Sequence, residues 1–322
     1  MKEKKFIEKF DVNIYIYILL ISFILSILLF LGGAVEQRYV MSISDSHYRL
    51  YIAMRMFAFA LSMAIFYKII LVVCNVIKNE KREKSIFFFT YLILNCFILI
   101  FVWPGIFKGD EFYIIPEIVN DLHLVPKQSI FTSVFYQIAL MIFPILASIT
   151  FLQIFIISVI AERIFAIIQE LVSHKHIEWF LLLPLVLFPV LDNNLFTLRT
   201  SQIAWVFADA IVTLIYMIKR EQFCNTCEII RISILVSFMF ALKNEYIFAI
   251  GWWVLSGLIY FFIRKIDFKN LAILLIVTVV SAGIFSYPSL IFKTADKYKM
   301  TSIITPLAYV LNVNYDELDE LP

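Results

Sequence analysis

The amino-acid sequence predicts an all-α protein, built as a polytopic bundle of transmembrane helices. Of the 322 residues, 62% are hydrophobic, only 16% are charged and 33 are phenylalanine. A soluble domain of this length would need about 25% charged residues to cover its surface. Apolar runs long enough to cross a bilayer also recur along the chain, with short polar linkers between them. These observations together indicate an integral membrane protein.

We predict about nine spans, each of about 17–25 residues. They cover 13–34, 52–77, 85–103, 144–168, 180–196, 202–218, 229–242, 246–263 and 270–292. The first run is too long for the core of a cleaved signal peptide, so we expect it to be retained as a span. No internal repeat or low-complexity linker divides the sequence. A single integral membrane domain over residues 1–322 is therefore the simplest organisation.

The basic residues alternate between the linkers. One set of linkers holds most of them: Lys2, Lys4, Lys5, Lys9, Lys78, Lys81, Arg82, Lys84, Arg163, Lys175, Lys219, Arg220, Arg231, Arg264, Lys265 and Lys269. The positive-inside rule places this set, with the N-terminus, in the cytoplasm. The loop 104–143 and the C-terminal tail 293–322 then face outward from the plasma membrane. The net charge of +2 is small, so we expect no nucleic-acid partner.

The outward loop 104–143 contains a second apolar stretch, 130–143, which ends before Pro144. This stretch is short for a crossing. We therefore predict a helix that lies in the membrane interface or re-enters from outside.

Two carboxylates begin this loop, directly after the third predicted span. The sequence reads Trp103-Pro104-Gly105-Ile106-Phe107-Lys108-Gly109-Asp110-Glu111. The Pro-Gly pair ends the helix at the membrane boundary, which would hold Asp110 and Glu111 close to the bilayer. A carboxylate there can act as a general base on an acceptor hydroxyl, or bind a divalent cation. An ordinary solvated acidic loop is the alternative.

Cationic groups occur at two other outward turns. Arg199 could bind phosphate oxygens in a bidentate fork, or simply extend to lipid headgroups. Lys243 begins the cluster Lys243-Asn244-Glu245, which could help hold a phosphate or form a plain polar turn. We include Glu245 and His123, from the loop 104–143, among the candidate substrate-binding residues.

Several charged residues fall within predicted spans. Asp209 lies in the sixth and Arg55 in the second, and an ion pair between them would lower the cost of inserting both. A proton- or ion-coupling role for Asp209 is the alternative. Lys68 can extend toward the cytoplasmic end of its span. Glu162 with its neighbour Arg163 is expected to mark the cytoplasmic end of the fourth span.

The sequence contains no Walker A loop, no GxGxxG and no GxSxG motif. It resembles instead the GT-C class of membrane glycosyltransferases, of the bacterial cell-surface polysaccharide type. The resemblance covers about 100–310. Its residues are Pro104 and Gly105 followed by Asp110 or Glu111, the stretch 129–153, the Leu198-Arg199 turn and the Lys243-Asn244-Glu245 cluster.

The resemblance implies transfer of a sugar from a polyprenyl-phosphate-linked donor to a glycan or lipid acceptor on the outer face. Asp110 or Glu111 would be the base or metal ligand, and Arg199 and Lys243 would bind the donor phosphate. Lys108 and Gly109 directly before Asp110 depart from the usual aromatic-then-acid spacing. Members of the class often continue into further spans, so we expect that this chain is short or truncated. Two alternatives stay open: a transporter or flippase of a lipid-linked saccharide, and a polysaccharide polymerase or ligase.

Overall fold

The computed structural model describes most of the chain and contains helices without strands in that part. The described residues are 2–31, 43–79, 82–107, 109–120, 122, 130–172, 183–197, 199–220, 226–243, 246–264 and 267–291. One isolated β-bridge, between Ile106 and Phe196, is the exception to the helical pattern. The prediction of an all-α protein is confirmed for these residues.

The chain divides into two compact units. The first comprises Met1–His123 and Val134–Cys224, and the second comprises Leu124–Ser133 and Asn225–Pro322. The boundary falls within α6 (Ile130–Ile142), the short apolar helix expected from the sequence. Its interfacial position stays a prediction.

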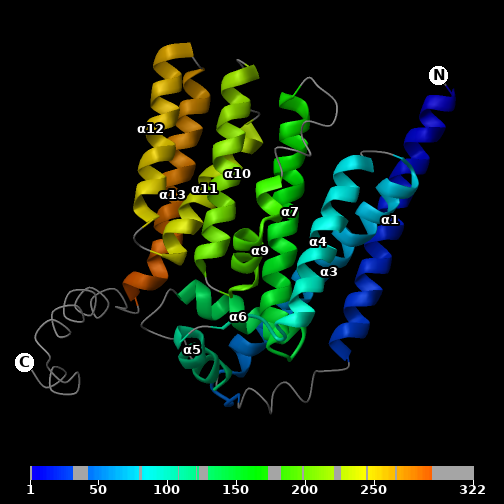
Figure 1. The fold of residues 1–322 in the computed structure, drawn as a ribbon, viewed down its shortest axis with the longest axis vertical. Helices are drawn as coiled ribbons and strands as arrows, with labels where there is room; N and C mark the ends of the chain where they lie inside the picture. The colour runs from blue at the N-terminus through cyan, green and yellow to red at the C-terminus, as the bar shows by residue number, and fades with distance from the viewer. Residues whose placement is uncertain are drawn as a thin grey trace, which may run out of the picture. The chain divides into compact units, whose positions relative to one another are not determined.

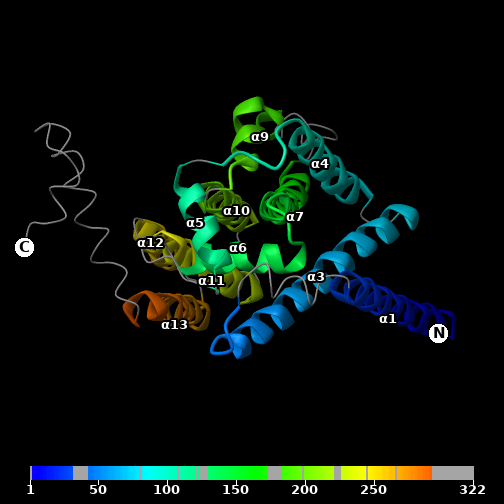
Figure 2. The ribbon, with the colours of Figure 1, turned by 90° about the horizontal axis from the view of Figure 1, so that it is seen from below.

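The first unit contains the other helices up to residue 220. They are α1 (Lys2–Leu31), α3 (Tyr48–Ile77), α4 (Arg82–Phe101), α5 (Gly109–Val119), α7 (Ala147–Leu171), the 3-10 helix η1 (Leu183–Val186), α9 (Phe188–Leu195) and α10 (Arg199–Arg220). Helix α7 lies between α4 and α10, and α1 packs along α3 (Figures 1 and 2). Because α7 is buried along most of its apolar length while α3 is largely exposed, α7 is the central helix of this unit.

Aromatic side chains pack the contact between α4, α7 and α10. Phe87 stacks on Phe165 with ring centroids 4.6 Å apart, and Tyr91 meets Trp205 edge-on at 5.8 Å. All four are buried in one cluster. Such pairs add about 0.5–1.5 kcal/mol beyond the apolar area that they bury. The α4–α7–α10 contact therefore provides a rigid support for the turns at the ends of these helices.

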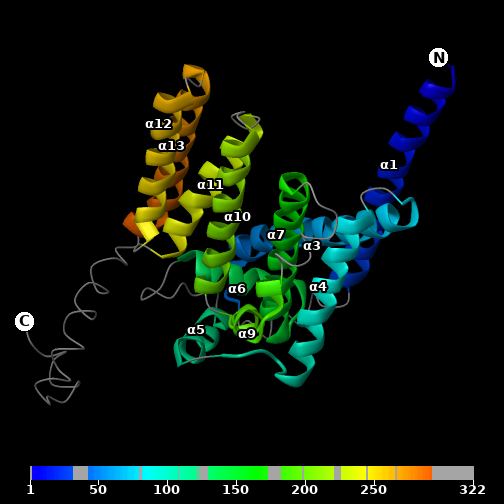
Figure 3. The same ribbon diagram turned by 45° about the horizontal axis from the view of Figure 1, so that its top comes forward.

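The second unit contains α11 (Thr226–Leu242), α12 (Ile247–Arg264) and α13 (Phe268–Ile291), which lie side by side (Figure 3). Hydroxyl groups join the helices: Ser281 bonds to Ser237 at 2.8 Å, and the Trp253 indole donates to Ser233 at 3.0 Å. Small polar residues of this kind are typical of helix contacts within membranes, where they allow close approach and bond across the interface.

Five described helices are long and apolar enough to cross a membrane: α3, α4, α7, α10 and α13. Three shorter apolar helices cover 14–30, 130–142 and 247–263. The chain is thus a helical protein with the character of a membrane protein, as predicted. The count of about nine spans and the direction in which each one crosses stay predictions.

The predicted span 180–196 differs from the structure. Its described part consists of η1 and the eight-residue α9, with Leu187 in an extended conformation between them. Eight residues of α-helix extend about 12 Å, well short of the hydrocarbon core of about 30 Å. Pro184 and Pro189 lack the backbone donors that a continuous helix would use. This segment therefore does not form the single crossing helix that hydropathy predicted.

Candidate functional site

The Pro-Gly turn directly after α4 is fixed by α7. Gly105 has a φ of +132°, a conformation that favours glycine, and its N–H donates to the Val102 carbonyl at 2.8 Å. The Thr150 hydroxyl donates to the Pro104 carbonyl at 3.2 Å. A Cβ on Gly105 would collide with the Thr150 side chain. The sequence prediction that the Pro-Gly pair ends a helix is confirmed, and the turn requires glycine.

This turn is joined to the turn between α9 and α10. The Ile106 N–H donates to the Leu195 carbonyl at 3.2 Å, and Ile106 forms a parallel bridge with Phe196. Because the bridge is parallel, the two segments leave it in the same direction. Helix α5 begins at Gly109 and helix α10 begins at Arg199, each three residues beyond its bridge residue. The N-termini of α5 and α10 therefore both follow shortly after the two segments that this bridge joins.

The predicted acids and the predicted arginine occupy these two N-termini. Asp110 and Glu111 lie in the first turn of α5, and Arg199 is the first residue of α10. Carboxylates are favoured at a helix N-terminus by about 0.3–1 kcal/mol, whereas a cation there is disfavoured. An arginine at this position is compensated when an anion binds beside it. The side chains of these three residues lie outside the described part of the structure.

A buried polar network holds the turn between α9 and α10. Its centre is Asn194, which accepts a hydrogen bond from the Trp205 indole at 2.7 Å. The Asn194 amide donates to the Tyr91 hydroxyl and to the Asn95 side chain, both at 2.9 Å. The Gln153 amide donates to the Asn194 carbonyl at 3.0 Å and to the Phe196 carbonyl. All five side chains are buried.

Two further bonds complete the support of this turn. The Tyr136 hydroxyl of α6 donates to the Thr197 carbonyl at 2.6 Å, and the Ser201 hydroxyl of α10 donates to the Asn193 carbonyl at 2.6 Å. An unpaired buried carbonyl costs about 1–3 kcal/mol, so the bond from Tyr136 to the buried Thr197 favours the observed path of the backbone. Sequence reasoning missed this network, although Asn95 and Gln153 inside apolar runs were a recognisable sign of it.

The charged groups within the helices pair differently from the prediction. The Asp209 carboxylate, 1% exposed, lies 3.1 Å from Nε of Arg163, so its partner on α7 is Arg163 rather than the expected Arg55. Arg55 instead bonds to the Tyr51 hydroxyl and to the Phe30 carbonyl. The expected pair was wrong because hydropathy gives the depth of a charge but not which helices are neighbours.

A second ion pair lies one residue away on α7. Nζ of Lys68 is 2.5 Å from Glu162, so Lys68 pairs inside the bundle rather than extending past the end of its helix. Helix α7 continues to Leu171, nine residues beyond Glu162. Glu162 and Arg163 therefore lie within the helix, and their position at the cytoplasmic end of the span stays a prediction. Each of the two ion pairs, Lys68–Glu162 and Arg163–Asp209, carries no net charge. This explains how the four charged side chains are accommodated among apolar helices.

The remaining predicted site residues lie in the second unit or outside the described residues. Lys243 follows α11 in the second unit, and its Nζ lies 5.9 Å from the Tyr246 ring centroid. Glu245 and His123 lie outside the described residues. Their roles in substrate binding stay predictions.

A metal centre has no support in the described part of the chain. No group of three or more His, Cys, Asp or Glu side chains gathers there. The side chains of Asp110 and Glu111 are outside that set, so a divalent cation at these two residues stays a prediction.

Comparison with known proteins found no protein-family model, no curated protein and no solved structure that matches this chain.

Proposed function

We propose that the chain is a membrane glycosyltransferase. It would move a sugar from a polyprenyl-phosphate-linked donor to a cell-surface glycan or lipid acceptor on the outer face of the plasma membrane. The observation that carries the proposal is the bridge between Ile106 and Phe196. It brings the segment that leads to Asp110 and Glu111 beside the segment that leads to Arg199. An acid–base group and a phosphate-binding group are the two components that such a transfer needs.

The proposed reaction uses these groups in complementary roles. The carboxylate of Asp110 or Glu111 accepts the proton of the acceptor hydroxyl while its oxygen attacks the anomeric carbon of the sugar. The bond between the sugar and the donor phosphate breaks, and the phosphate leaves on its polyprenyl carrier. Arg199, at the N-terminus of α10, neutralises the charge that develops on the leaving phosphate.

The packing around the turn supports this assignment. Catalytic groups must be held in position by side chains whose own conformations are fixed. The Pro104–Ile106 segment contacts α7 through Thr150 and the α9–α10 turn through Leu195. The segments that precede the two helices are thereby held by hydrogen bonds to α7 and to each other.

The test is transfer of a labelled sugar in membranes that contain the protein. We expect Asp110→Asn or Glu111→Gln to lower transfer by about 10²–10⁴-fold, the usual contribution of a general base. Arg199→Gln should also lower it. The matched control is Glu117→Gln, which removes an exposed carboxylate from the same helix, α5. Full transfer in Asp110→Asn, in Glu111→Gln and in the double variant of these two, at normal protein level, would contradict the proposal.

A transporter or flippase of a lipid-linked saccharide is the second candidate. Its supporting observation is the charge within the bundle, where Arg163 and Asp209 form a pair with one nearly inaccessible carboxylate. Under this candidate, Asp209→Asn abolishes movement of the lipid-linked saccharide while Asp110→Asn has no effect. Product analysis separates a polymerase or ligase from a single-sugar transferase, because only the former extends a chain.

A further inference from the structure

A polar groove of the first unit lies between the first turns of α4 and the last turns of α7. Its volume is about 790 Å³, within the range of about 300–1,000 Å³ for ligand pockets. The charged residues that line it are Arg82, Glu83, Lys84 and Glu170. The wall of this groove therefore offers two cations and two carboxylates to one occupant.

Two of these charges have only neutral partners. The Arg82 guanidinium donates to the Asn79 side chain at 3.3 Å, and the Gln169 amide donates to the Glu83 carboxylate. Arg82 and Glu83 are both exposed, and neither belongs to an ion pair among the described residues. A cation and a carboxylate thus stand side by side in the groove, each accessible to a group of opposite charge.

Hydrogen bonds hold the two walls of the groove together. The bond between Glu83 and Gln169 joins α4 to α7. Glu170 accepts a hydrogen bond from the Tyr216 hydroxyl of α10 at 2.7 Å, and Lys84 is half-buried. The positions of the charges are therefore set by three packed helices rather than by a loop.

The length of α4 places this groove at the surface of a membrane. The helix has 20 residues, which extend about 30 Å, the thickness of the hydrocarbon core. When α4 crosses the bilayer, Arg82 at its start lies at the level of the lipid headgroups. Ile86, one turn deeper, is exposed and also lines the groove. The groove thus runs from the headgroup level toward the hydrocarbon.

We propose that this groove binds the headgroup of a phospholipid with a primary ammonium group, the chemistry of phosphatidylethanolamine. The lipid phosphate would accept hydrogen bonds from Arg82 and Lys84. The ammonium group would donate to Glu83 and Glu170. The glycerol and the acyl chains would continue past Ile86 into the bilayer.

The paired charges of the wall select this headgroup. An anionic phospholipid satisfies the two cations but leaves both carboxylates beside a further negative charge. A choline headgroup has no N–H, so it cannot donate a hydrogen bond to a carboxylate. A primary ammonium carries three donors, which suits a site with two carboxylates.

The groove is distinct from the candidate functional site. Thr150, which holds the Pro-Gly turn, lies near the start of α7, whereas Gln169 lies near its end. With a rise of 1.5 Å per residue, these two positions are about 28 Å apart along the helix. Lipid binding in the groove therefore does not depend on the proposed reaction.

The experiment uses the full chain in phosphatidylcholine vesicles with a trace of phosphatidylethanolamine that bears a diazirine on one acyl chain, close to the glycerol. After illumination, mass spectrometry locates the label on the peptides. We expect the label at the start of α4, around Ile86, and we expect excess unlabelled phosphatidylethanolamine to displace it. Arg82→Gln and Glu83→Gln should each lower this labelling about tenfold or more, because each removes a charge-assisted hydrogen bond.

Matched controls change exposed charges outside the groove. Lys269→Gln and Asp267→Asn, at the start of α13, should leave labelling unchanged. Glu83→Gln keeps an oxygen that accepts the bond from Gln169, so its loss of labelling reports the charge rather than the contact between α4 and α7.

The contrary outcomes are each recognisable. Labelling spread evenly over exposed helix faces, or persistent labelling in both variants when each is folded by circular dichroism, would overturn the proposal. Equal displacement by excess phosphatidylglycerol would show that the carboxylates do not select the headgroup and would overturn it too. Displacement by soluble phosphoethanolamine, but not by phosphatidylethanolamine in the bilayer, would assign the groove to a water-soluble zwitterion instead. None of these measurements uses transferase activity.

Discussion

Replacement of Asn194 by alanine tests whether the buried network fixes the turn between α9 and α10. The Asn194 side chain forms three hydrogen bonds, one from Trp205 and one each to Tyr91 and Asn95. Hydrogen bonds between membrane helices contribute on average about 0.6 kcal/mol each, with a maximum of about 1.7. Asn194→Ala should therefore lower the free energy of unfolding by about 2 kcal/mol, and by at most about 5 kcal/mol.

The neighbouring residue provides a matched control. Asn193 is exposed, and its side chain donates only to the Pro189 carbonyl within α9, at 2.8 Å. The carbonyl that accepts from Ser201 belongs to its backbone and is retained in any substitution. Asn193→Ala should then cost less than about 0.5 kcal/mol, as is usual for surface positions.

The assay is thermal unfolding of the purified chain in one detergent, followed by intrinsic tryptophan fluorescence. With about 2–4 °C lost per kcal/mol for a chain of this size class, Asn194→Ala should lower the Tm by about 4–8 °C. Its transfer activity should fall as well, because the segment that leads to Arg199 loses its support. Equal Tm values for the two alanine variants would refute the assignment of the network as the support of this turn.

Two further predictions concern the backbone and the ion pairs. Gly105→Ala should destabilise the protein by about 1–3 kcal/mol, because it places a side chain on a residue with a positive φ. The control is Gly251→Ala on α12, where the added methyl group meets open space. This variant should be as stable as the parent or more stable. Chemical denaturation of both variants measures this, and a Gly105→Ala protein as stable as the parent would contradict it. Asp209→Leu should cost about 3–5 kcal/mol by removing the carboxylate that pairs with Arg163, and the double variant with Arg163→Met should recover most of the loss. If the losses of unfolding free energy in the two single variants simply add in the double variant, Asp209 and Arg163 do not stabilise each other.

Much of the helical architecture could be predicted from hydropathy alone. The range 144–168 was expected as a span, and α7 runs from Ala147 to Leu171. Long apolar runs fix a helix because the backbone must satisfy its own hydrogen bonds in lipid. The failure at 180–196 has a local cause, since Pro184 and Pro189 break an apolar run that hydropathy counts as continuous.

The pairings of side chains could not be predicted in the same way. The sequence identified Asp209 as a charge that needs a partner, but hydropathy put Arg163 at the cytoplasmic end of its span and left Arg55, inside a span, as the candidate. The partner is Arg163 because α7, which carries it, packs against α10, which carries Asp209. The bridge from Ile106 to Phe196 likewise could not be predicted from the sequence, because it joins two irregular segments that have no hydrophobic periodicity.

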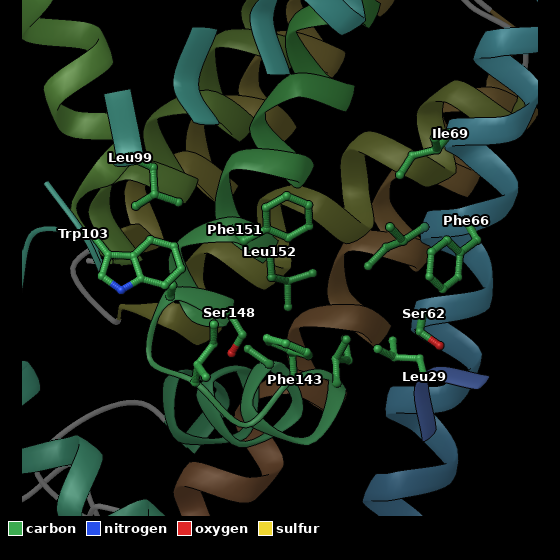
Figure 4. A pocket seen from close by; sticks show the side chains of 15 residues that line it. Leu29, Ser62, Phe66, Ile69, Leu99, Trp103, Phe143, Ser148, Phe151 and Leu152 are labelled. Carbon is green, nitrogen blue, oxygen red and sulfur yellow. The ribbon is translucent and has the colours of Figure 1, made fainter. Parts of the chain in front are cut away.

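Helix α7 contacts three separate features of the first unit: the two turns near the candidate site, an apolar cavity and an ion pair. Its first turns present Thr150 and Gln153 to the turns that lead to the candidate site. Its residues Phe151 and Leu152 line an apolar cavity bounded by α3, α4 and α6 (Figure 4), and its interior holds Glu162 in an ion pair with Lys68. A rigid helix transmits a shift at one of these places to the others, because packed interiors deform little.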